Sequence, residues 1–154
     1  MEVNVIKALR SIAFIVFTCI IATQVPGPAQ AQQAATFQVI VNSSNEITSM
    51  AVKDVSRHFL KKRTKWDNGA KVNAVDQKGK AKARTTFSKS VLGKSVSAVK
   101  AYWQKKIFSG RGVPPPEKSS DSQVIAYVAS HPGGVGYVSN GTATSKVKVI
   151  KITD

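Results

Sequence analysis

Arg84, Thr85 and Thr86 occupy consecutive positions where a helix is expected to begin, and together they could bind an anion. A guanidinium donates charge-assisted hydrogen bonds to oxyanions, and the free N–H groups of a helix N-terminus favour negative charge. Ser43 and Ser44 lie in the turn before another expected helix, and we include their hydroxyl groups among the candidate ligand-binding residues. The alternative is that Arg84 is a solvated residue in a first helical turn.

A second group of cations lies within five residues at the expected end of a helix and comprises Lys61, Lys62, Arg63 and Lys65. Basic residues suit the negative end of a helix dipole, and positive charges this close together attract polyanions. Such binding falls with added salt, because exposed charges are screened over about 8 Å at physiological ionic strength. We therefore take this basic group as the candidate polyanion-contacting surface.

The residue types that carry catalysis or hold metals form no recognisable pattern. His58 and His131 are the only histidines, and neither has metal-ligand spacing with Cys, Asp or Glu. The sequence contains no G-x-S-x-G elbow, no Walker loop and no G-x-G-x-x-G segment. We therefore predict no catalytic residues, no metal and no cofactor, and we expect a protein that is not an enzyme.

The N-terminal residues have the three parts of a secretory signal peptide. Lys7 and Arg10 precede the apolar run Ser11–Ala22, and a Pro/Gly segment leads to the small-residue end Ala29–Ala31. We expect cleavage after Ala31 and a periplasmic or secreted product with no membrane span; the alternative is an uncleaved anchor. The single cysteine, Cys19, would leave with the signal, so the mature chain would have no disulfide.

The remaining chain has room for one domain, and its charge is strongly one-sided. We expect a polar tether at 32–36 and a single domain at 37–154. A chain that starts at Gln32 keeps a net charge of +14, and Lys53–Lys118 holds 18 basic and 4 acidic residues. Such a field attracts anions, acidic proteins, envelope polymers and anionic surfaces, whereas the simpler interpretation is solubility.

Hydrophobic periodicity and turn residues predict strands that alternate with helices. The expected strands are 37–42, 71–76, 134–139 and 146–152, and the expected helices are 46–60, 84–92, 98–108 and 121–131. Ser95 or Ser97 would cap the third helix. This order predicts an α/β fold with a small mixed β-sheet flanked by helices.

The segment "SHPGGVGYVS" should turn a helix into a strand. Pro132 ends the helix, and Gly133 and Gly134 let the chain enter the sheet. Gly136 within the strand indicates close approach of a helix or another backbone. A glycine loop that contacts a ligand is the alternative.

Four aromatic residues lie among basic residues, one after the first expected helix and three within the third. Trp66, Tyr102, Trp103 and Phe108 would suit nucleic-acid stacking. Trp103 and Phe108 fall near the apolar face of that helix, however, so we expect them to pack in the core. Nucleic acid is therefore not among the expected partners.

Four segments resemble, in the same order, parts of phosphate-type periplasmic solute-binding proteins, which have the type II periplasmic binding protein fold. The segments are "FQVIVNSSNEITSM", "VKDVSRHFLKKRTKWDNG", "AVKAYWQKKIFSGRGVPPP" and "VIAYVASHPGGVGYVS". The resemblance runs from about Phe37 to Ile152 but covers only one of the two lobes that close on a solute. It implies a short, single-lobe relative of the substrate-binding component of phosphate ABC transporters, and an ABC permease or an acidic envelope component as its partner.

The resemblance also implies where an anion would bind and how weakly. Members of this family place a Ser-Gly-Thr-Arg segment at a helix start around the phosphate. Alignment on Phe87 places residues 81–84 there, and only Arg84 matches. One lobe supplies half a cleft, so we expect weak binding of phosphate or a similar oxyanion. The alternative function is a basic interaction module that docks on an acidic protein, an envelope polymer or an anionic surface.

Overall fold

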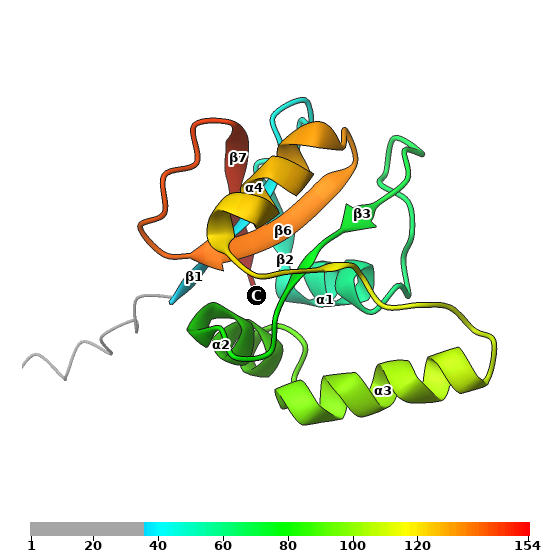
Figure 1. The fold of residues 1–154 in the computed structure, drawn as a ribbon. Helices are drawn as coiled ribbons and strands as arrows, with labels where there is room; N and C mark the ends of the chain where they lie inside the picture. Colours follow the sequence, from blue (N-terminus) through cyan, green and yellow to red (C-terminus); the bar gives the residue numbers. More distant parts are fainter. Residues whose placement is uncertain (1–35) are drawn as a thin grey trace, which may run out of the picture. The chain divides into compact units, whose positions relative to one another are not determined.

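The computed structural model describes residues 36–154, and Figure 1 shows a sheet with helices on both of its faces. The elements, in chain order, are β1 (Phe37–Asn42), β2 (Ser49–Ala51), α1 (Val52–Phe59), β3 (Asn73–Ala74), β4 (Asp76–Gln77), α2 (Lys82–Ser90), α3 (Val96–Phe108), β5 (Glu117–Lys118), α4 (Asp121–Ser130), β6 (Gly134–Ser139) and β7 (Val147–Thr153). The predicted signal peptide lies outside the described residues and, like the tether boundary, stays a prediction. No helix within 36–154 is both long and apolar enough to cross a membrane.

The main sheet has the strand order β2-β7-β1-β6-β3, and a separate parallel pair joins β4 to β5. β1 lies in the centre and runs antiparallel to both β6 and β7, whereas β2 and β3 add parallel edges. A central strand is covered on both faces, which is why five of the six residues of β1 are buried. The predicted mixed α/β architecture is confirmed.

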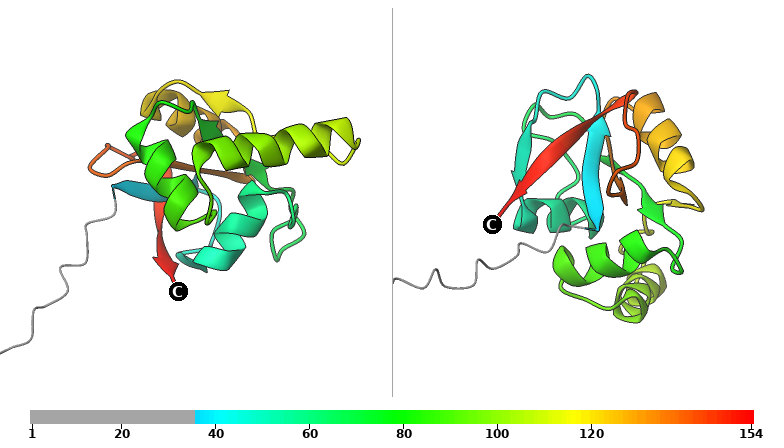
Figure 2. Two further views of the ribbon diagram at one scale, coloured as in Figure 1. Left: turned by 90° about the horizontal axis from the view of Figure 1, so that it is seen from below. Right: turned by 90° about the vertical axis from the view of Figure 1, so that its left-hand side faces the viewer.

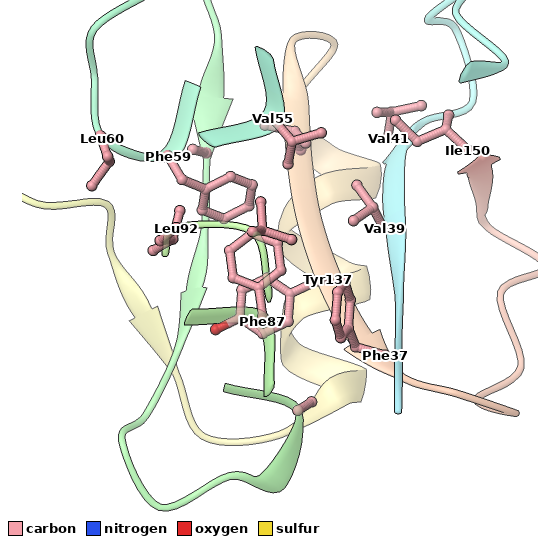
Figure 3. Packing of buried hydrophobic residues seen from close by; sticks show 14 of the residues in the cluster. Phe37, Val39, Val41, Val55, Phe59, Leu60, Phe87, Leu92, Tyr137 and Ile150 are labelled. Atoms are coloured by element: carbon pink, nitrogen blue, oxygen red, sulfur yellow. The ribbon is translucent and has the colours of Figure 1, made fainter. Parts of the chain in front are cut away.

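One face of the sheet carries an aromatic core against α1, α2 and α3. The rings of Phe87 and Tyr137 stack at 3.9 Å with an interplanar angle of 8°, and Phe37 and Phe59 pack around them (Figure 3). Phe59, Phe87 and Tyr137 are fully buried. Aromatic side chains contribute large buried areas, so this cluster fixes α1 and α2 on the sheet.

The other face of the sheet is covered by α4, whose Val124 and Val128 pack on Ile40 and Val138. A Cβ atom on Gly136 would lie 2.8 Å from Val124 Cγ1, 2.9 Å from Val75 Cγ1 and 3.1 Å from Val128 Cγ2. The prediction that a helix approaches this glycine closely is therefore confirmed.

Several elements differ from their expected boundaries. The helix expected from Glu46 begins at Val52, because Ser49–Ala51 pairs with β7 as a parallel edge strand. The strand expected at 71–76 is instead two short strands that pair with different partners. β3 pairs with β6, and β4 pairs with β5. Val75, which lies between them, still donates its N–H to the Val135 carbonyl. Ser95, rather than Ser97, caps α3 by accepting from the Ala98 N–H.

The two aromatic residues expected in the core of α3 have opposite environments. Trp103 is buried, but Phe108 is 90 % exposed. The prediction was wrong for Phe108 because α3 extends past the rest of the domain before it ends (Figure 2). Its last turn therefore has no sheet to pack against.

Candidate functional site

Arg84 projects inward from the first turn of α2 and forms an ion pair with Asp76 of β4. Both side chains are almost fully buried, with 4 % and 6 % of their surfaces exposed. The Asp76 carboxylate also accepts from the Tyr137 hydroxyl and from the Gln77 N–H at 2.9 Å. Burial raises the pKa of the Tyr137 phenol, which keeps it a neutral donor. Arg84 is thus not a solvated residue, and much of its charge is compensated.

A cleft of about 250 Å³ lies beside this pair, and we call it the Arg84 cleft. Its lining comprises Asp76, Gly79, Arg84, Val96, Lys100, Trp103, Pro114, Pro115 and Glu117. Among residues 36–154, the Arg84 Nε has no hydrogen-bond partner, and no side chain caps the N-terminus of α2. The Arg84 Nε–H, the free N–H groups of α2 and the Lys100 ammonium can donate hydrogen bonds to an anion, whereas the carboxylates of Asp76 and Glu117 would repel it.

The hydroxyl residues predicted to join Arg84 are not brought together with it. Thr86 lines a different cleft beside Phe37, and Thr85 is exposed and donates to the Ala81 carbonyl. Ser43 and Ser44 are exposed in the turn after Asn42, at the end of β1 away from Phe37 and α2. The predicted set is therefore distributed over separate surfaces.

A second cleft, of about 340 Å³, has a more positive lining, and we call it the Lys61 cleft. It is lined by His58, Lys61, Arg63, Thr64, Lys71, Val72, Asn73, Ala74, Pro116 and Tyr127, with no Asp or Glu among these described residues. Lys61 has a positive φ of 49° at the position that follows the end of α1, where glycine is usual. Burial lowers the pKa of the Lys61 ammonium, and the charge of Lys71 lowers it further.

The basic group predicted for polyanion contact is divided by the fold. Lys61 and Arg63 line the Lys61 cleft, whereas Lys62 lines another cleft with Arg57. Arg63 also forms ion pairs with Asp54 and Asp67. Sequence reasoning missed Lys71 and Tyr127 as neighbours of Lys61, because only the tertiary fold brings these distant segments together.

His58, which lines the Lys61 cleft, is the group from which we expect a pH-dependent stability. Its Nδ1–H donates to the Arg63 carbonyl at 3.1 Å, and its ring packs 4.8 Å from that of Trp66. Burial lowers the pKa of His58 below its ordinary value of 6.5, with a smaller contribution from the charge of Arg63. The folded state therefore holds a neutral imidazole at pH values where the unfolded chain already binds a proton.

We expect the free energy of unfolding to fall as the pH drops below 6.5 and to level off below the folded-state pKa. Urea unfolding between about pH 7 and about pH 5.5, above the range in which ordinary carboxylates titrate, measures this loss. A His58→Gln variant should lack the loss, and a His131→Gln variant should retain it. Equal pH dependence in the two variants would contradict the assignment to His58.

Among residues 36–154, no group of three or more His, Cys, Asp or Glu side chains could hold a metal ion.

Comparison with solved structures identifies the architecture. The chain is similar to a phosphate ABC transporter substrate-binding protein with bound phosphate from Clostridium perfringens, at 14% identity and a TM-score of 0.60, over 76% of this chain and 44% of that one. An ABC-type phosphate transport receptor from Vibrio cholerae gives 19% identity, a TM-score of 0.60, and 77% and 47% coverage. The fold is one lobe of a periplasmic binding protein.

PstS from Borrelia burgdorferi gives the same result, with 12% identity and a TM-score of 0.59 over 77% of this chain and 47% of that chain. The chain thus spans less than half the length of these solved structures. No protein-family model and no curated protein sequence matches it. At these identities, the likeness establishes the fold alone.

Proposed function

We propose that this chain is a non-catalytic, single-lobe relative of phosphate-transport receptors and that it binds phosphate or a similar oxyanion weakly. The observation that carries the proposal is the match of about three-quarters of the chain to a phosphate ABC transporter substrate-binding protein and to an ABC-type phosphate transport receptor. Periplasmic location after cleavage at Ala31, and association with an ABC permease, belong to the same proposal.

The Arg84 cleft is our proposed oxyanion site. The buried guanidinium has an unpartnered Nε, the N-terminus of α2 has no side-chain cap, and Lys100 stands at the cleft. Charge-assisted hydrogen bonds contribute roughly 1.5–3 kcal/mol when buried and less in an open cleft. Repulsion from the carboxylates of Asp76 and Glu117 makes the free energy of oxyanion binding less favourable. Without a second lobe to exclude water, we expect a Kd in the millimolar range, or about −4 kcal/mol.

Lys100 allows a test that leaves the buried pair intact. We expect Lys100→Gln to weaken phosphate binding about two- to fivefold, because an exposed cation contributes roughly 0.2–1 kcal/mol. Two-dimensional amide NMR during a phosphate titration measures both affinity and location, and the shifts should centre on Gly79, Lys82 and Ala83. Lys146→Gln, in the turn before β7, is the matched control and should leave the affinity unchanged.

Two results would contradict the assigned site. Shifts that centre on Lys61 and Lys71 would move oxyanion binding to the Lys61 cleft, and shifts nowhere would overturn oxyanion binding altogether. A parallel titration with polyphosphate tests the alternative function. Strongly salt-dependent polyphosphate binding centred on Lys61 and Lys62, without phosphate binding, would favour a docking module.

A further inference from the structure

The chain from the end of β4 to the loop before β5, which contains α2 and α3, is strongly cationic. Residues 77–116 contain ten lysines and arginines and no aspartate or glutamate. The last of these cations, Lys105, Lys106 and Arg111, surround the end of α3, where the helix extends past the rest of the domain (Figure 2). A surface of one sign attracts anionic partners and repels cationic ones.

The same end of α3 is apolar at its most exposed point. Phe108 is 90 % exposed, Val113 is 61 % exposed and Ile107 is 49 % exposed. We call Ile107, Phe108 and Val113 the apolar tip. An exposed apolar residue is ordinary by itself, but three large exposed apolar side chains within seven residues at a protruding helix end are unusual and point to an interaction site.

Backbone hydrogen bonds give the turn after α3 a defined conformation. The Gly110 N–H donates to the Ile107 carbonyl at 3.0 Å, and the Arg111 N–H donates to the Lys106 carbonyl at 2.9 Å. With Gly110 at a φ of 66°, this is the Schellman arrangement that ends many helices. The tip is therefore presented by an ordered turn.

In many such turns an apolar residue after the glycine packs back on the last helical turn. Here the residue after the glycine is Arg111 and its counterpart in the last helical turn is Lys106, so two positive charges take the place of an apolar contact. The Lys106 ammonium lies instead 5.3 Å from the Tyr102 ring centroid and 5.9 Å from that of Trp103. The loop sequence thus leaves the apolar tip uncovered and places cations around it.

We infer that the apolar tip docks on an anionic lipid bilayer. Apolar side chains can enter the boundary between headgroups and acyl chains, while Lys105 and Arg111 remain beside the anionic headgroups. A protruding tip needs no complementary hollow in a fluid bilayer, whereas an acidic protein would have to supply a matching pocket. This inference is independent of oxyanion binding in the Arg84 cleft.

A tryptophan at the tip reports insertion directly. Trp66 and Trp103 are buried, with 5 % and 6 % exposure, so Phe108→Trp in the full chain adds the exposed fluorophore. We expect its emission to shift to the blue on phosphatidylcholine vesicles that contain phosphatidylglycerol, and to be quenched when their acyl chains are brominated. Pure phosphatidylcholine or high salt should abolish the shift.

A matched reporter separates tip insertion from other adsorption. Val149→Trp places the fluorophore on β7, at a residue that is 42 % exposed, and should show no shift. Phe108→Ser should reduce partitioning to the anionic vesicles by about tenfold, the loss expected for one large apolar side chain.

Three results would overturn the inference. Equal shifts at positions 108 and 149 would mean that the chain adsorbs without a specific tip. Binding to polyglutamate but not to vesicles would assign the tip to an acidic macromolecule. Concentration-dependent self-association that Phe108→Ser abolishes, without vesicle binding, would assign the tip to a second copy of the chain.

Discussion

Replacing Arg84 with methionine is expected to destabilise the domain by about 3–5 kcal/mol, because it leaves the buried Asp76 carboxylate without its counter-charge. Hydrogen bonds from Tyr137 and Gln77 to Asp76 would remain, but they do not replace a guanidinium in a site removed from water. Urea unfolding at neutral pH measures the change.

The double variant Asp76→Asn/Arg84→Met should recover much of that loss. The asparagine carbonyl can still accept from Tyr137, and no uncompensated charge remains buried. Lys100→Gln, at the same cleft, should change stability by no more than about 0.5 kcal/mol. An Arg84→Met variant as stable as Lys100→Gln would show that Arg84 and Asp76 do not act as a buried pair, and binding studies could then use Arg84 variants directly.

Local sequence signals predicted those elements whose surroundings agree with their own pattern. The apolar, β-branched stretch at 37–42 is the central strand, and the helix from Asp121 ends before Pro132. The helix predicted at 46–60 was wrong for its first six residues, because Ile47 and Met50 pack against the core in a non-helical conformation. Pairing of Ser49–Ala51 with β7 decided that segment, and the partner lies about 100 residues further along the chain.

The candidate site was less accessible to sequence reasoning. The helix start with Arg84 could be predicted, but nothing local indicated that Asp76 would compensate its charge. Thr85 and Thr86 are neighbours in sequence, yet successive residues of a helix point in different directions, so their hydroxyls do not converge with Arg84. The Lys61 cleft depends on segments that only the fold brings together.

Gly133→Ala should cost about 3 kcal/mol of stability, near the upper end for overpacking. A Cβ atom at this position would lie 1.9 Å from the Lys71 carbonyl oxygen, which is part of the backbone. Either β6 or the chain entering β3 would have to move. That movement would strain the bonds that the Gly133 carbonyl accepts from the Asn73 N–H at 2.8 Å and the Trp66 Nε1–H at 3.1 Å.

Gly79→Ala is the matched control, because its Cβ atom would meet only Val96 Cγ1, at an ordinary 3.5 Å, and φ there is not positive. That substitution should be neutral or stabilise the domain by about 0.4–1 kcal/mol, because alanine lowers the conformational entropy of the unfolded chain. Equal stabilities of the two variants, measured by urea unfolding, would contradict the packing role of Gly133. A Gly133→Ala variant that folds normally but loses phosphate binding would instead support a ligand-contacting glycine loop. The predicted pattern, a large loss at Gly133 and none at Gly79, would show that steric limits at the turn between α4 and β6 account for the glycine at position 133.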